Sequence, residues 1–267
     1  MIRRLFVPAL LAVLLSACVS AGGPPVAQGN DSKDRVTASD ESDDSKRARV
    51  RLELATAYFS RGQMTTALDQ VKLAIIADPN LGEAFNLRGL IYAGLGDDRL
   101  AEDSFKRALQ INGRDADTMQ NFGWYLCRRK RYAEADAMFG QALAVPEYRD
   151  GARTLLAQGV CQAFAGDARQ AERTLLRSYE LDPSNPSTAV NLSELLYRRS
   201  QFERARFYIR RVNSLTEVAS AQTLWLAARI ENKLGNVAET QALGGQLRSR
   251  FPDSRESSAF ERGLFDE

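Results

Sequence analysis

One pattern dominates the sequence: similar stretches recur every 34 residues over most of its length. Small residues mark the repeat at two fixed points. The first set is Ala55, Gly89 and Gly123, and the second set is Ala67, Ala101 and Ala135. A period of this length indicates stacked structural units, each of which needs its neighbours to bury its apolar face.

Each period predicts a helix, a turn and a second helix. The first small residue lets two helices approach closely, Gly62 and Gly96 allow the positive φ of a tight turn, and Pro79 ends a second helix. These are features of the tetratricopeptide repeat. The sequence therefore predicts an all-α fold, a right-handed α-solenoid of about six hairpins. The expected hairpins are residues 48–81, 82–115, 116–149, 152–185, 186–219 and 221–254. The sixth copy is the weakest, with Thr240 and Gly244 at its marker positions, as expected of a terminal cap.

The start of the chain has the pattern of a lipoprotein export signal. Basic residues precede an apolar stretch of about a dozen residues, which is shorter than the roughly 20 that a membrane-spanning helix needs. The stretch Leu15–Cys18 then resembles the lipobox of bacterial lipoproteins, which implies lipidation of Cys18 and removal of residues 1–17. Because Val19 rather than Asp follows, the same resemblance implies the periplasmic face of the outer membrane. An ordinary signal peptide with a chance cysteine is the alternative.

Composition divides the rest of the chain. Residues 18–46 are rich in Gly, Pro, Ser and Asp and lack aromatic residues, so we expect a lipidated cysteine followed by a disordered tether. The solenoid is expected over residues 47–256, and a C-terminal tail over residues 257–267.

The residue types and motifs that the sequence lacks favour a binding protein over an enzyme. The chain has no histidine, which excludes Ser-His-Asp and Cys-His catalysis and imidazole metal sites. It has no Gly-rich phosphate loop, and its 36 basic and 34 acidic residues nearly balance. We therefore expect no cofactor, metal, nucleic acid or small-molecule substrate. Catalysis by carboxylates alone, for instance cleavage of peptidoglycan, stays open, although no carboxylate pair stands out.

The first helix of each tetratricopeptide hairpin lines the concave face of the solenoid. The register places aromatic, aliphatic, amide and charged side chains there. They are Leu52, Phe59, Asn86, Leu90, Gln120, Trp124, Arg128, Leu156, Val160, Phe164, Glu194, Tyr197, Arg198, Trp225 and Arg229. Such a face suits an extended or helical peptide; the alternative for any single aromatic residue is burial between repeats. Two basic runs, 128–131 and 204–211, would either meet an acidic partner or lipid head groups, or form solvated helix faces.

Two further cysteines fall at similar heights in neighbouring first helices. Helices that pack 8–10 Å apart can bring facing Cα atoms within disulfide range. In an oxidising periplasm we favour a bond between Cys127 and Cys161, which would close a loop of 34 residues. Two small buried thiols without a bond are the alternative.

These features together resemble the PilF/PilW family of type IV pilus biogenesis lipoproteins. The likeness covers residues 48–254, and four stretches carry it. They are Asn121–Cys127 with Arg131, Tyr132, Glu134 and Ala135 after it, then Pro146–Arg149, Asn191–Tyr197 and Leu247–Pro252. The resemblance implies a pilotin, a lipid-anchored outer-membrane protein that binds the pilus secretin and promotes its localisation and multimerisation. A repeat lipoprotein that serves as a scaffold for peptidoglycan hydrolases or for outer-membrane barrel assembly is the alternative.

Overall fold

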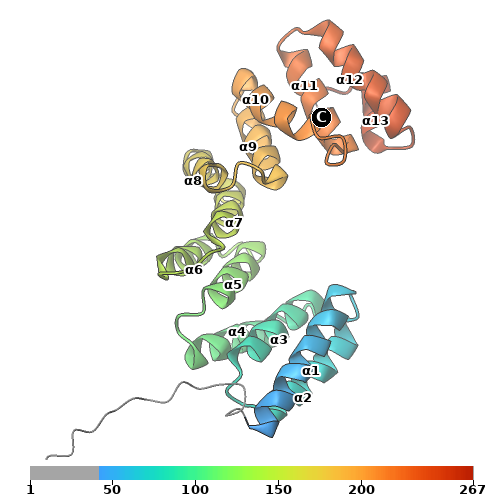
Figure 1. The fold of residues 1–267 in the computed structure, drawn as a ribbon. Coiled ribbons are helices and arrows are strands. Elements are labelled where there is room, and N and C mark those ends of the chain that lie inside the picture. The colour runs from blue at the N-terminus through green and yellow to red at the C-terminus, as the bar shows by residue number, and fades with distance from the viewer. Residues whose placement is uncertain (1–41, 267) are drawn as a thin grey trace, which may run out of the picture. The chain divides into compact units, whose positions relative to one another are not determined.

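The computed structural model describes residues 42–266, and the expected signal peptide, the lipidation at Cys18 and most of the tether lie outside them. The described residues form thirteen helices and no strand (Figure 1). The first six are α1 (Asp43–Ser60), α2 (Met64–Ala77), α3 (Gly82–Leu95), α4 (Asp98–Ile111), α5 (Ala116–Arg128) and α6 (Tyr132–Ala144). The others are α7 (Gly151–Phe164), α8 (Ala168–Leu181), α9 (Pro186–Arg198), α10 (Phe202–Asn213), α11 (Ala221–Lys233), α12 (Val237–Arg250) and α13 (Arg255–Glu261).

Helices α1 to α12 pair into six hairpins at the expected positions, so the all-α tetratricopeptide solenoid is confirmed. The turn inside a hairpin needs one residue with positive φ, and glycine supplies it in four copies, as at Gly62 and Gly96. Lys130 and Ser200 adopt the same conformation in the third and fifth copies, with φ of 61° and 57°. Side-chain caps such as Asp115 and Asn185 then start the next first helices by accepting backbone N–H bonds.

The helices form two layers. Each first helix contacts the first helix of the next repeat, from α1 with α3 through to α9 with α11. Between residues 42 and 266, the second helices of neighbouring repeats make no such contact. First helices are therefore crowded and second helices are splayed apart, which places the first helices on the inner, concave side of the stack.

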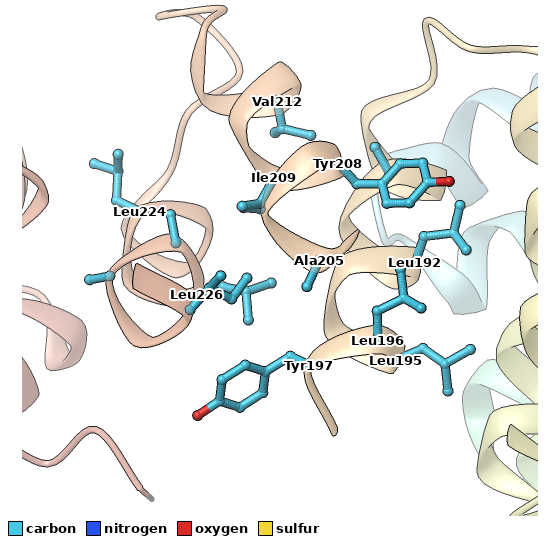
Figure 2. Close-up of a cluster of buried hydrophobic side chains, with 14 of the residues drawn as sticks. Leu192, Leu195, Leu196, Tyr197, Ala205, Tyr208, Ile209, Val212, Leu224 and Leu226 are labelled. Carbon is cyan, nitrogen blue, oxygen red and sulfur yellow. The ribbon is translucent and has the colours of Figure 1, made fainter. Parts of the chain in front are cut away.

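The core lies inside and between the hairpins, and its small residues are placed for close approach. A Cβ atom at Gly123 would lie 2.9 Å from the buried ring of Phe139, and one at Gly159 would lie 2.7 Å from Leu175. The largest cluster of buried side chains spans the last three repeats and includes Leu192, Ile209 and Leu224 (Figure 2).

Two boundaries differ from the sequence prediction. Helix α1 begins at Asp43, because Ser42 caps it by accepting a bond from the Ser45 N–H, so residues 43–46 are helical rather than part of the tether. At the other end, most of the expected tail is ordered structure. Helix α13 packs on α11 and α12, and the ring of Phe260 occupies the space where a Cβ of Gly244 would be. Gly244 is thus a contact site for α13, which is the cap of the stack.

Candidate functional site

The predicted concave residues all lie on the inner-layer helices α1, α3, α5, α7, α9 and α11, but they differ in accessibility. Phe164, Arg128 and Arg198 are exposed, and Phe164 as a residue is 61% accessible. Ten are half-buried. They are Leu52, Phe59, Asn86, Leu90, Trp124, Leu156, Val160, Glu194, Trp225 and Arg229.

Gln120 and Tyr197 are buried, in contrast to the open position expected for them. The Gln120 side-chain oxygen accepts a hydrogen bond from Arg153 of the next repeat at 3.1 Å. Tyr197 lies under the guanidinium of Arg229, and its hydroxyl points away from the leucines of α9 (Figure 2). Both side chains hold neighbouring repeats together.

The middle of the inner layer presents apolar side chains that are exposed or half-buried. Leu156, Val160 and Phe164 follow one another at four-residue spacing along α7, so they share one helix face. Trp124 lies half-buried on the preceding first helix, α5. This arrangement offers apolar contacts to a peptide laid across the repeats.

Polar groups of this face partly bond to one another. The Asn121 side-chain amide donates to the Asn86 oxygen at 3.2 Å, which links α5 to α3. Arg198 donates to Glu194 of the same helix at 2.8 Å. A peptide that used these groups would therefore exchange existing hydrogen bonds for new ones.

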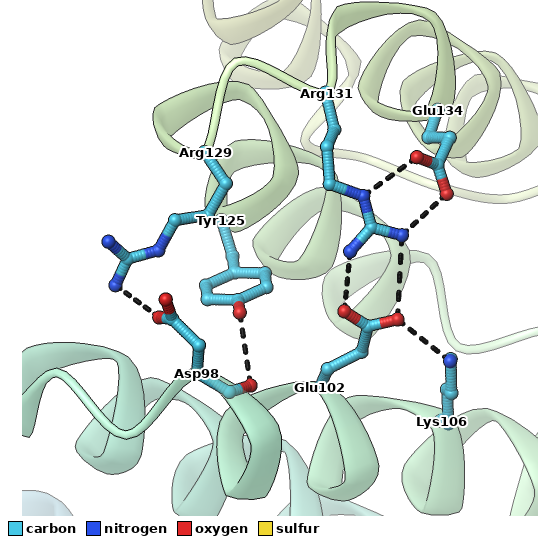
Figure 3. Close-up of polar contacts among 7 residues, drawn as sticks. All are labelled: Asp98, Glu102, Lys106, Tyr125, Arg129, Arg131 and Glu134. Atoms are coloured by element: carbon cyan, nitrogen blue, oxygen red, sulfur yellow. Dashed lines mark hydrogen bonds and ion pairs between the residues drawn. The ribbon is translucent and has the colours of Figure 1, made fainter.

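An ion cluster fixes the junction between the second and third repeats. Figure 3 shows the Arg131 guanidinium between Glu102 of α4 and Glu134 of α6, with Lys106 on the other side of Glu102. Hydrogen bonds from Arg131 and then from Lys106 lower the pKa of the Glu102 carboxyl below its ordinary value. The same bonds to Glu134 and Glu102 raise the pKa of Arg131.

Most arginines of the two basic runs are engaged inside the protein. Arg129 pairs with Asp98 and Arg131 with Glu102 across one junction (Figure 3). In the second run, Arg204 pairs with Glu172 at 2.6 Å, whereas Arg206 and Arg210 both face Glu231. The Glu231 carboxylate is buried, at distances of 3.7 and 2.9 Å from those two arginines. These runs therefore act mainly as links between repeats.

The structure brings Cys127 of α5 and Cys161 of α7 together in a disulfide, with Cα atoms 5.8 Å apart. Both residues are buried, in the cluster that joins the third and fourth repeats. The bond thus ties together two inner-layer helices that carry Trp124 and Phe164.

Residues 42–266 contain no group of acidic or cysteine side chains that could hold a metal ion. Over the same range, none of the helices has both the length and the apolar character for crossing a bilayer.

The sequence pattern did not single out three residues at the end of the inner layer. Phe265 and Asp266 lie against the last first helices, and Lys233 of α11 pairs with Asp266. The sequence does carry a signal for a further helix here. Ser254 is a helix-capping residue, and apolar Phe260, Leu264 and Phe265 follow it in the segment expected to be the tail.

Sequence profiles of the tetratricopeptide repeat match residues 82–115 and 116–145. The chain is 25% identical over 252 residues to the type IV pilus assembly protein PilF of Pseudomonas aeruginosa, covering 94% of this chain and 95% of PilF.

Two solved structures resemble the fold closely. The crystal structure of PilW, described as a widely conserved type IV pilus biogenesis factor, has a TM-score of 0.73 and 31% identity, covering 79% of this chain and 97% of PilW. The structure of Pseudomonas aeruginosa PilF has a TM-score of 0.71 and 23% identity, covering 83% of this chain and all of the other.

Proposed function

Because the chain belongs to the PilF/PilW family of tetratricopeptide-repeat proteins, a family of type IV pilus biogenesis, we propose that it is a pilotin. In this role it is an outer-membrane lipoprotein without catalytic activity. It binds the secretin of the pilus and promotes the localisation and multimerisation of that secretin in the outer membrane.

The observation that carries the proposal is the extent of the similarity. The match to PilW covers 79% of this chain and 97% of that protein, so it extends well beyond one generic repeat. A shared repeat alone would support only a shared fold. The inner layer of the solenoid adds a surface with exposed Phe164 and half-buried Trp124, the kind of side chains that anchor peptides.

The proposed mechanism divides the work between two parts of the chain. Acyl chains on Cys18, which lies outside the described residues, would hold the protein at the membrane, because two or more lipid chains give stable attachment. The inner-layer face would recognise a secretin segment. Confinement to the membrane surface raises the effective concentration of both partners.

Deletion of the gene tests this proposal. Outer membranes of the deletion strain are run on a non-denaturing gel and probed for secretin multimers, with complementation by the wild type and by Cys18→Ala. The proposal predicts that multimers disappear, and that the wild type restores them whereas Cys18→Ala does not. Normal multimers in the outer membrane of the deletion strain would refute the pilotin role and direct attention to cell-wall or barrel-assembly partners.

A further inference from the structure

The chain turns back onto its own inner layer after helix α13. Gly263 has a φ of 68°, and its N–H donates to the carbonyl of Phe260. The Leu264 N–H donates to the carbonyl of Ala259. This pair of bonds around a left-handed glycine is a Schellman cap, which reverses the direction of the chain. The residues that follow therefore run against α11 and α9 rather than away from the protein.

Phe265 makes the central contacts of this segment. Its ring centroid lies 5.2 Å from that of Trp225 and 5.6 Å from that of Phe260. Its backbone carbonyl accepts hydrogen bonds from the Arg229 Nε at 3.2 Å and from the Tyr197 hydroxyl at 3.4 Å. Three residues predicted for the concave face thus bind one residue of the chain's own end.

A charge contact follows at the next residue. Asp266 forms an ion pair with Lys233, one turn beyond Arg229 on α11. The hydrogen bond from Lys233 lowers the pKa of the Asp266 carboxyl. Both partners reach solvent, with 82% of the Asp266 side chain accessible, so the pair adds a modest contribution to the contacts of Phe265.

The contacts use features that any peptide of similar chemistry can supply. They are one aromatic ring, one backbone carbonyl and one carboxylate on the residue that follows the aromatic one. Beside them, a hollow of about 410 Å³ is lined by Trp225, Leu264 and residues of α13, which leaves room for a different side chain in place of Leu264.

We propose that Tyr197, Trp225, Arg229 and Lys233 form a subsite for a partner segment in which an aromatic residue is followed by an acidic one. The chain's own residues 264–266 fill this subsite until such a partner displaces them. The inference goes beyond the pilotin proposal, because it assigns the chemistry of the bound segment whichever protein carries it.

A peptide with the sequence of residues 262–267, labelled with fluorescein at its N-terminus, is the probe. Its binding is followed by fluorescence anisotropy, both to the full chain and to a variant that ends at Gly263. Because a tethered segment acts at an effective concentration near the millimolar range, we expect the shortened chain to bind at least about tenfold more tightly.

Two further comparisons test the chemistry. A peptide with alanine in place of the phenylalanine is expected to bind the shortened chain about tenfold more weakly, because the ring contacts to Trp225 and Phe260 are lost. In the shortened chain, Lys233→Glu is expected to weaken binding about fivefold. Lys72→Glu, on an exposed site of the outer-layer helix α2, makes the same charge change away from the subsite and is expected to leave binding within twofold.

Equal binding to the full and the shortened chain, no binding to either, or equal loss in Lys233→Glu and Lys72→Glu would overturn the proposal. Circular dichroism checks that the shortened chain keeps its helices. If it does not, Phe265→Ala in the full chain takes its place, since this variant keeps α13 and its cap and is expected to show the same gain in peptide affinity.

Discussion

At the scale of single residues, Glu102 shows how one carboxylate holds two repeats in a fixed relation. It is 20% accessible and bonds to Lys106 of its own helix and to Arg131 of the next hairpin. Its lowered pKa means that the folded state favours the ionised form. This contribution to stability is present above the ordinary pKa of glutamate, near 4.3, and disappears as the pH falls through the lower folded value.

We therefore predict that Glu102→Gln lowers the free energy of unfolding by about 1–2 kcal/mol at pH 7, and that the difference shrinks below about pH 4. Urea denaturation at pH 7 and again below about pH 4 measures the free energy of unfolding of the variant and the wild type. Asp103→Asn is the matched control, because Asp103 pairs with Arg99 at 3.2 Å where both side chains are exposed; its change should stay within about 0.5 kcal/mol. Equal effects of the two substitutions would contradict this account of Glu102.

Close packing within a hairpin makes a second prediction at this scale. Gly123→Ala places a methyl group 2.9 Å from the fully buried Phe139 ring, and the resulting strain should cost about 1–3 kcal/mol. Gly140→Ala changes the other helix of the same hairpin, where a Cβ meets nothing within 4 Å. That substitution should be neutral or stabilise by up to about 1 kcal/mol. Thermal melts of the two variants give the comparison, and a destabilised Gly140→Ala protein would count against this explanation.

At the scale of helices, the sequence predicts what local spacing determines. The six hairpins follow from small residues, turn glycines and prolines at fixed intervals. Contacts between distant residues do not follow from spacing, because they depend on how helices pack in space. The burial of Gln120 and Tyr197, the pairing of Arg131 with Glu102 and the placement of Phe265 are of this kind.

The disulfide between α5 and α7 leads to a prediction for the middle of the stack. Closing a loop of 34 residues should stabilise the protein by about 3–4 kcal/mol in the chain-entropy model. A thiol reductant should therefore lower the unfolding midpoint of the wild type but not that of the Cys127→Ala/Cys161→Ala variant. Alkylation of unfolded, unreduced protein followed by mass spectrometry gives the direct test. Alkylation of both cysteines would show that the bond is absent.

Helix α13 covers the core at the C-terminal end of the stack, where it packs on α11 and α12. Phe260 is 7% accessible, and its ring contacts Gly244 and Trp225. Phe260→Ala should cost about 3 kcal/mol and should loosen mainly α11 and α12, because stability in a repeat array is passed between neighbours. Hydrogen exchange measured by mass spectrometry should rise there and stay unchanged in α1 to α4. A uniform rise along the chain would instead indicate that the whole solenoid unfolds as one unit.

At the scale of the described molecule, the two helices of each repeat lie in different layers and differ in what they contact. The inner-layer helices are adjacent to one another and carry the candidate binding residues, whereas the outer-layer helices are separated. The residues that the sequence register predicts for this face all lie on the inner-layer helices, and their part in binding stays a prediction. The register could not show which residues are free, because burial at Gln120 and coverage of Trp225 depend on side chains from other elements.

Site-specific photocrosslinking tests the central claim, that the inner layer binds a pilus partner. A photoreactive phenylalanine replaces Phe164 on α7 or, as the matched control, Phe207 on outer-layer helix α10; the two residues are 61% and 54% accessible. Irradiation of cells and mass spectrometry of the adducts should identify the secretin from position 164 and not from position 207. Secretin adducts from position 207 alone, or none from either position, would contradict the claim.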